Sequence, residues 1–192
     1  MSAVLEHAHD PATEATLAAW RAREAEVRAL HAGSGLGRPE QFAGCTGMDV
    51  FRAMLAGQIP IPPISETLDF ILVEAEPGRV QFQGRPRFAH YNPLGTVHGG
   101  WIATLLDSAV GCSVHTTLAP GKAYTTLELK VNYVKALTER TPLVRAVGEV
   151  IAVGSRVATS EGRLVGPDGT LYAHATTTCL IFDALPPRTA TA

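Results

Sequence analysis

The chain contains one long apolar helical segment that is followed only by segments with a β-strand pattern. Residues 98–117 are predicted to form the helix, which is apolar on nearly all sides. After Pro120 and Gly121 come four β-like runs, at residues 123–134, 142–153, 156–165 and 171–182. Because no crossover helix separates these runs, the strands are expected to pair antiparallel. An apolar helix must be covered, so the sequence predicts an α+β fold with an antiparallel sheet wrapped around one central helix.

Two more strands are expected ahead of the helix, at residues 67–75 and 80–83, joined by a Glu-Pro-Gly turn. The run 123–134 alternates clearly between apolar and polar residues. One face of this strand is predicted to carry Leu127, Leu129, Val131 and Tyr133, and the other face Thr126, Glu128, Lys130 and Asn132.

The first third of the chain has a different pattern and is predicted to be an N-terminal helical extension. Asp10 and Pro11 have the character of a helix start, and a loose apolar stripe continues to about His31. A second short helix is expected at 48–56, and the proline-rich segment 59–64 reads as an extended linker. The expected division is therefore an extension at 1–64, a main domain at 65–183 and a flexible tail at 184–192.

Composition narrows the classes of protein to consider. A chain of 192 residues suits one domain with a sizeable core, and a net charge of −2 gives no reason to expect a nucleic-acid partner. The three cysteines lie far apart without a CxxC spacing, which favours a reducing compartment over a disulfide frame or a zinc site. The N-terminus lacks the pattern of a signal peptide, and the longest apolar stretch is too short to span a bilayer. We expect a cytoplasmic protein without a membrane partner, a metal or a cofactor.

The predicted helix carries one acid, Asp107, and starts at two glycines, Gly99 and Gly100. A carboxylate on an apolar helix has a desolvation cost, so it needs a buried partner or a chemical role. Backbone N–H groups at a helix start without side chains can approach a carbonyl oxygen closely, and the helix dipole assists them. An oxyanion site and a carboxylate are what thioester hydrolysis requires, with Asp107 acting either as general base toward water or as direct nucleophile.

Small and polar residues form a stripe along this helix, where a subunit boundary or a substrate channel is expected. The stripe consists of Thr104, Asp107, Ser108, Gly111 and His115.

The motif N-P-x-G-x-x-H-G-G, followed by an apolar helix with an acid and then by TTLELKVNY, resembles the hotdog-fold acyl-CoA thioesterases of the phenylacetic-acid-degradation (PaaI-like) type. The resemblance covers residues 65–183, and its specific part is Asn92 six residues before His98 and Asp107 nine residues after it. It implies a hotdog fold, an acyl-CoA substrate and hydrolysis to a free acid and coenzyme A. It also implies an obligate homodimer, usually paired into a homotetramer, in which the glycine turn of one subunit meets the acid of the other.

The resemblance also implies roles for further residues. It places Asn92 near the thioester carbonyl or the attacking water, although turn chemistry alone explains an Asn before a Pro. His98 is a candidate for orienting the turn, for bonding the carbonyl or for general acid catalysis. Thr126 matches a hydroxyl that holds the water beside the acid, with Thr125 as the alternative if the register slips by one. Basic side chains near the strand ends would bind the nucleotide of coenzyme A. The candidate catalytic residues are Asp107, Asn92, Gly99, His98 and Thr126, and the candidate substrate- and CoA-binding residues are Gly100, Thr125, Ser108, Lys122 and Arg156.

Two other functions remain open at this stage. A hydratase or dehydratase of the same fold also pairs a His with a helix carboxylate, although the HGG start argues against it. A non-catalytic acyl-CoA-binding module is the other alternative, and the retained acid Asp107 argues against it. The acyl group is not identified by the sequence.

Overall fold

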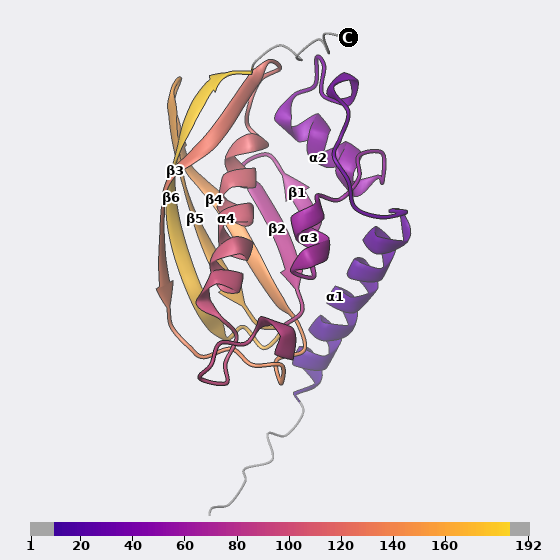
Figure 1. Ribbon diagram of the computed structural model, residues 1–192, viewed down its shortest axis with the longest axis vertical. Helices are drawn as coiled ribbons and strands as arrows, with labels where there is room; N and C mark the ends of the chain where they lie inside the picture. Colours follow the sequence, from indigo (N-terminus) through magenta and orange to yellow (C-terminus); the bar gives the residue numbers. More distant parts are fainter. Residues whose placement is uncertain (1–9, 185–192) are drawn as a thin grey trace, which may run out of the picture.

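A computed structural model describes residues 10–184 of the chain. Within them, a six-stranded antiparallel sheet has the order β1-β2-β4-β5-β6-β3. The sheet curves around the helix α4 (Gly99–His115), as Figure 1 shows. The strands are β1 (Phe70–Glu76), β2 (Arg79–Gly84), β3 (Lys122–Tyr133), β4 (Val144–Val153), β5 (Val157–Val165) and β6 (Leu171–Asp183). The predicted α+β hotdog fold is confirmed.

The helix α4 packs its apolar side into the concave face of the sheet. Leu105, Leu106 and Val110 are fully buried there, together with residues of β1, β2, β4, β5 and β6. The buried hydroxyl of Ser160 in β5 donates to the carbonyl of Val110 at 2.8 Å, so a polar contact also fixes the helix. Packing against the sheet therefore fixes the position of the helix α4.

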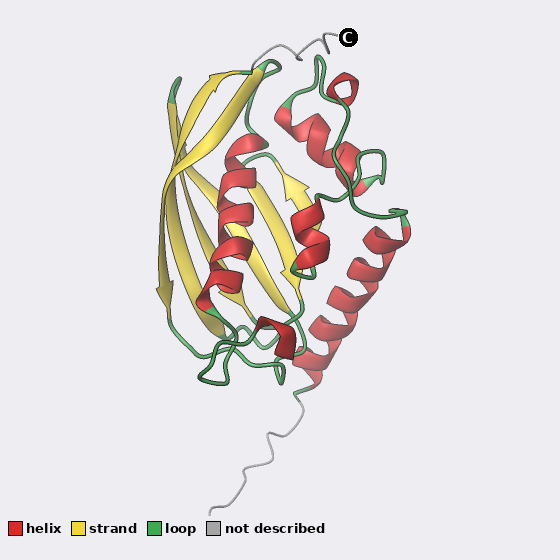
Figure 2. Cartoon of the chain, viewed as in Figure 1, coloured by secondary structure: helices red, strands yellow, loops and turns green. Residues whose placement is uncertain are grey.

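The N-terminal helices pack on both faces of the sheet edge. The helix α1 (Pro11–Ala29) is capped by Asp10 and packs Val27 against Ile71 and Val73 of β1. Phe70 and Leu72 of the same strand point the other way, into the core around α4. Figure 2 shows α1 and α4 on opposite sides of β1 and β2. The helix α2 (Gly47–Leu55) contributes Met48 and Phe51 to the same core as α4.

The start of β1 differs from the sequence prediction. The short helix α3 (Pro63–Thr67) begins in the last two residues of the segment predicted as an extended linker, because proline fits the first turn of a helix. The strand predicted at residues 67–75 therefore begins only at Phe70, after Asp69 turns the backbone with φ of +50°. Two 3-10 turns, Pro39–Gln41 and Phe88–His90, complete the helical elements of the described residues.

The predicted alternation of β3 is interrupted by a β-bulge. Thr126 pairs with Cys179 and Glu128 with Thr178 of β6, so Leu127 is an extra residue without a partner. As a result Thr126 and Leu129 face α4 together, whereas Leu127 is 58% exposed. The prediction that Thr126 lies on the face opposite Leu129 was wrong, because a two-residue period cannot register an inserted residue.

The tail predicted at residues 184–192 lies, except for Ala184, outside the described residues. In the part of the chain that the structure describes, no helix is both long and apolar enough to cross a membrane.

Candidate active site

The start of α4 is organised by His98, which occupies the N-cap position. Its Nδ1 accepts the backbone N–H of Gly100 at 2.8 Å, so the remaining ring nitrogen, Nε2, carries the proton in the neutral imidazole. The N–H of Gly100 was predicted to be free for a ligand, but it is hydrogen-bonded to the side chain of His98. The N–H of Gly99 has no acceptor among residues 10–184.

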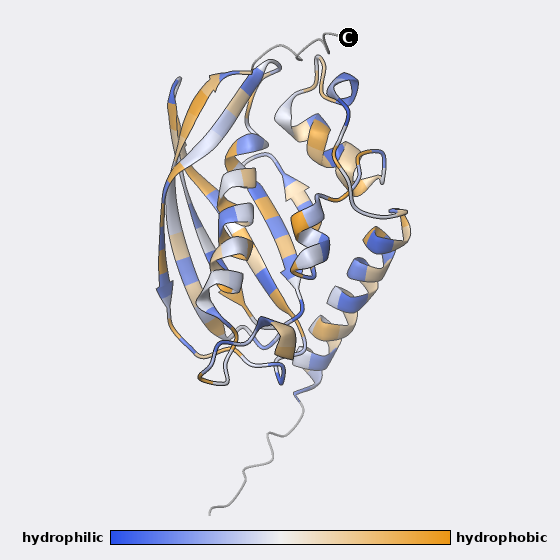
Figure 3. Ribbon diagram, viewed as in Figure 1, coloured by the Kyte–Doolittle hydropathy of each residue, from blue (hydrophilic) through white to orange (hydrophobic). Residues whose placement is uncertain are grey.

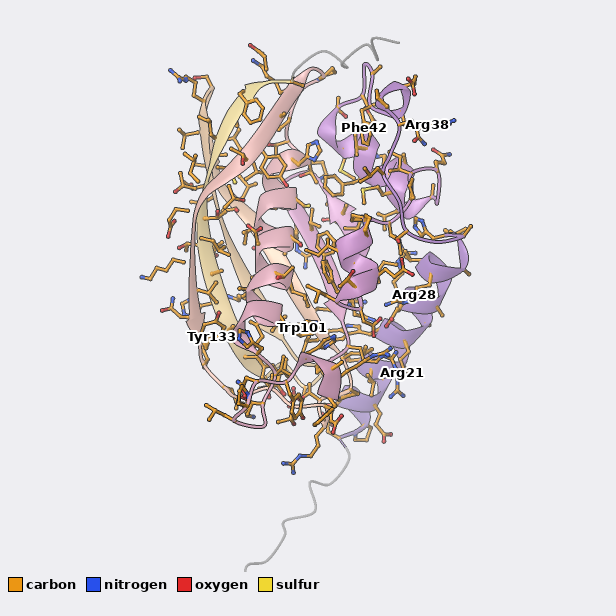
Figure 4. The ribbon with its side chains drawn as sticks, viewed as in Figure 1. Arg21, Arg28, Arg38, Phe42, Trp101 and Tyr133 are labelled. Carbon is orange, nitrogen blue, oxygen red and sulfur yellow. The ribbon has the colours of Figure 1, made fainter. Side chains whose placement is uncertain are left out.

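Tyr133, at the end of β3, contacts the first residue of α4. Its hydroxyl donates to the carbonyl of Gly99 at 3.0 Å, and a Cβ at position 99 would lie 3.0 Å from its ring. Figure 4 shows Tyr133 and Trp101 on either side of this helix end. A side chain at position 99 would therefore require the Tyr133 ring to move by a few tenths of an ångström. Tyr133 was not identified from the sequence, where its only signal is an aromatic residue at the end of the strand TTLELKVNY.

Asn92 orders the loop that precedes α4. Its side-chain oxygen accepts the N–H groups of Leu94 at 2.9 Å and Thr96 at 3.3 Å, and its amide donates to the Thr96 hydroxyl at 3.0 Å. A cavity of about 330 Å³ beside this loop is lined by Asn92, Gly99, Ile102, Tyr133 and Lys135, among others. Asn92 therefore lies at the helix start, with its side chain engaged in a turn.

Asp107 lies two turns along α4, on the side of the helix that faces the edge strand β3. Its carboxylate is half-buried, and Oδ1 accepts the hydroxyl of Thr126 at 3.1 Å. Its second oxygen has no hydrogen-bond donor within residues 10–184. The bulge at Leu127 places Thr126 here, whereas Thr125 is exposed on the opposite face. The hydroxyl of Ser108 donates a hydrogen bond to the carbonyl of Thr104 in the same helix, at 2.8 Å.

The structure does not bring Gly99 and Asp107 together within one chain. They are eight residues apart on a continuous helix, which corresponds to about 12 Å at 1.5 Å per residue. One thioester carbonyl cannot touch both groups of the same helix. The two candidate groups of a single subunit therefore cannot act together on one carbonyl.

The two predicted CoA-binding cations lie at the other end of the helix. Lys122 begins β3, seven residues after α4 ends, and its Nζ forms an ion pair with Asp183 at 2.6 Å. Arg156 is exposed in the β4–β5 turn, next to Val157, which pairs with Leu180 of β6. Both cations are thus near the carboxyl end of α4, away from Gly99 of their own subunit.

The thiols and the possible metal ligands form no second catalytic centre. Burial raises the pKa of the Cys112 thiol to about 12, so this group on the stripe side of α4 remains protonated. No group of three or more His, Cys, Asp or Glu residues able to hold a metal ion occurs in residues 10–184.

Comparison with known proteins agrees with this architecture. Residues 94–173 match the family model of the thioesterase superfamily. A putative thioesterase of Ralstonia eutropha JMP134, a phenylacetic acid degradation-related protein, is 30% identical with a TM-score of 0.62, over 68% of this chain and 98% of that one. A mutant of the phenylacetic acid degradation protein PaaI from Thermus thermophilus is 28% identical with a TM-score of 0.55, over 62% of this chain and 97% of that one.

A thioesterase family protein from Silicibacter pomeroyi shares the fold at 23% identity, with a TM-score of 0.61 over 77% of this chain and 100% of that one. No curated protein matches the sequence. The matched model contains the helix start and Asp107, and the Ralstonia protein is covered almost completely. The chain therefore belongs to the thioesterase superfamily and is a hotdog-fold thioester hydrolase with PaaI-like relatives.

Proposed function

We propose that the protein is an acyl-CoA thioesterase that hydrolyses its substrate to a free acid and coenzyme A. The observation that carries this proposal is the half-buried Asp107 carboxylate, held by Thr126 of the edge strand β3, with its second oxygen free of donors from residues 10–184. A carboxylate in this setting can take a proton from water at neutral pH. The phenylacetic acid degradation proteins among its structural relatives support a CoA thioester as the substrate class.

In the proposed reaction the thioester carbonyl accepts the Gly99 N–H of one subunit, at the positive end of the α4 dipole. Asp107 of the second subunit removes a proton from a water molecule, whose oxygen attacks the carbonyl carbon. The tetrahedral intermediate then collapses, the C–S bond breaks, and the proton passes to the departing thiolate of coenzyme A. Direct attack by Asp107, with a mixed anhydride that water then hydrolyses, is the alternative route.

The other candidates support this chemistry in our proposal. Thr126 orients the carboxylate, and Asn92 shapes the turn beside the substrate. His98 holds the helix start through Gly100 and presents its Nε2 proton toward the carbonyl. Lys122 and Arg156, which lie near the carboxyl end of α4, are proposed to bind the nucleotide phosphates.

We propose a homodimer as the smallest active species. The strand β3 is an edge of the sheet, and Leu127 exposes an apolar side chain on it, which is a liability unless a partner strand pairs there. A two-fold axis beside β3 would place two α4 helices antiparallel, with Gly99 of each opposite Asp107 of the other. We expect two such dimers to associate into a tetramer.

The reaction class is tested by measuring thiol release from a panel of aryl and medium-chain acyl-CoA substrates. Asp107→Asn keeps the size of the side chain and should lower the turnover of the best substrate by at least ~100-fold, the usual contribution of a general base. Glu149→Gln, which removes an exposed carboxylate paired with Arg79, is the matched control and should leave turnover unchanged. Full turnover by Asp107→Asn would contradict the assignment, and hydration of an enoyl-CoA without thiol release would indicate a hydratase.

The shared site is tested by mixing two inactive proteins, Asp107→Asn and Gly99→Val. In an equal random mixture half of the dimers are mixed and each contains one intact site, so about a quarter of wild-type activity should return. No recovery in mixed dimers that have been verified by mass would show that each site is built within one chain.

A further inference from the structure

A cluster of five charged side chains joins the N-terminal helix to the segment that leads to the active-site turn. Arg28 of α1 contacts Glu24 at 2.8 Å and Asp69 at 3.0 Å. Asp69 also contacts Arg87 at 2.6 Å, and Glu24 lies 3.8 Å from Arg85. Figure 4 shows Arg28 on the side of α1 that faces the sheet edge. We call these residues the Asp69 cluster.

The acids of this cluster are largely shielded from water. The side chain of Glu24 is 9% exposed and that of Asp69 is 20% exposed, whereas the partner arginines are 36–55% exposed, so solvent screens these ion pairs in part and less than fully exposed pairs. Asp69 is also the one non-glycine residue with positive φ in residues 10–184. Such a conformation persists where the surroundings determine it, and it clusters at functional positions.

A continuous series of contacts leads from Asp69 to the start of α4. The carbonyl of the preceding residue, Leu68, accepts the indole N–H of Trp101 at 2.8 Å. The ring of His90 stacks on Trp101 at 5.0 Å, and its Nδ1 accepts the N–H of Arg87 at 3.2 Å. The carbonyl of His90 accepts the N–H of His98 at 2.7 Å, next to Gly99.

We propose that Asp69 is a positioning residue for thioester hydrolysis, which fixes the turn at Gly99 by tying it to α1 through Arg28 and Arg87. This inference rests on the proposed function, since it needs Gly99 to bind the reacting carbonyl. It gives the N-terminal helix a role in the reaction. Without the two ion pairs of Asp69, the segment 85–90 loses its charged connection to Arg28 and keeps the Arg85–Glu24 ion pair, the His90–Trp101 stack and its backbone hydrogen bonds. A displacement near 1 Å at reacting groups can reduce rates by about 100-fold.

His90 provides a readout of this connection that does not depend on activity. Burial lowers the pKa of His90, the charge of Asp69 raises it and the charge of Arg87 lowers it. Because the ring stacks on Trp101, protonation of His90 should change the emission of that indole. A Trp20→Phe background leaves Trp101 as the sole tryptophan.

Two variants distinguish an effect on the position of the Gly99 turn from an effect on the charge of His90. Asp69→Asn keeps a residue that tolerates positive φ and removes the charge, so the His90 midpoint should move to lower pH. Arg87→Gln breaks the same ion pair from the other side, and it should move the midpoint to higher pH. Both variants should lower kcat by at least about tenfold while KM changes little, because both release the turn. Glu149→Gln is again the control, and it should change neither the midpoint nor kcat.

Five outcomes can be distinguished. Lower kcat in both variants with opposite midpoint shifts supports the proposal. Opposite changes in kcat that follow the charge of His90, or wild-type kcat in a folded Asp69→Asn protein, overturn it. Unshifted midpoints in both variants also overturn it, because the cluster would then not reach His90. If Asp107→Asn retains full turnover, the proposed catalytic site fails instead, and the Trp101 measurement still tests the tie between Asp69 and the turn.

Discussion

The distance between α4 and β4 depends on one glycine, and we expect Gly148→Ala to be strongly destabilising. A Cβ at position 148 would lie 2.2 Å from the carbonyl oxygen of Ala109 and 2.8 Å from the backbone nitrogen of Val110. Ordinary contact begins at 3.4 Å, so the helix would have to withdraw by 3.4 − 2.2 = 1.2 Å. The obstacle is helix backbone, which cannot rotate away as a side chain can. The loss should therefore reach the upper end of overpacking costs, about 3 kcal/mol or more.

The same displacement should affect the reaction, because α4 carries both Gly99 and Asp107. The hydrogen bond from Thr126 to Asp107, 3.1 Å long, would be lost if the helix moved away from the sheet. We expect Gly148→Ala to lower the free energy of unfolding in urea by about 3 kcal/mol, equivalent to a Tm lower by about 6–12 °C for a chain of this size. Its kcat should fall as well. Gly35→Ala is the control, since its Cβ would meet Pro60 at an ordinary 3.5 Å, and it should cost less than about 1 kcal/mol. A loss below about 1 kcal/mol in Gly148→Ala would refute the reasoning that backbone contact sets the helix position.

Two further predictions concern buried polar groups. Arg145 is buried on the outer face of the sheet. It donates hydrogen bonds to Gln83 and Glu74 at 3.0 Å each, and its guanidinium lies 4.6 Å from the centre of the Trp20 ring of α1. Figure 3 shows polar and apolar residues alternating along β2, the strand that pairs with β4 at Arg145. Arg145→Ala should cost about 3 kcal/mol in urea unfolding, with partial recovery in Arg145→Lys, and an unchanged unfolding midpoint would contradict this. His115 lies between the rings of Phe51 and Tyr124, and burial lowers its pKa below the ordinary 6.5. As the pH falls, His115 is therefore protonated in the unfolded chain before it is protonated in the folded protein. The free energy of unfolding should therefore decrease as the pH falls below about 6.5. His115→Phe should reduce this pH dependence, and the part that remains is due to His90, whose pKa is also lowered. An unchanged pH dependence in His115→Phe would show that His115 is not the group involved.

Local rules were sufficient to predict most of the fold. The apolar helix that became α4 and the four strands after Gly121 depend on hydrophobic period and turn chemistry, which are properties of neighbouring residues. The same rules led to α1 with its Asp10 cap. The motif from Asn92 to Asp107 indicated the family, which is confirmed, and the candidate catalytic groups, which remain a prediction, because the spacing of a carboxylate from a helix start is set along one continuous segment.

Only the tertiary structure placed Thr126 against Asp107. The bulge at Leu127 depends on which residues of β6 pair with β3, and alternation along one strand contains no information about that pairing. The capture of the Gly100 N–H by His98 and the packing of Tyr133 on Gly99 are likewise contacts that depend on the final geometry of a turn and a distant strand.

The Asp69 cluster shows the same limit most clearly. Its members come from α1, from the start of β1 and from the segment after β2, and each reads in the sequence as an ordinary surface charge. Their effect arises only when folding brings half-exposed arginines against two shielded acids, where Coulomb interactions are less screened than between fully exposed charges. The sequence by itself determined the helix, the strands and the spacing of the candidate reactive groups, since these depend on short-range periodicity and spacing. The tertiary structure decided how those groups are held, because that depends on contacts between segments far apart in the chain.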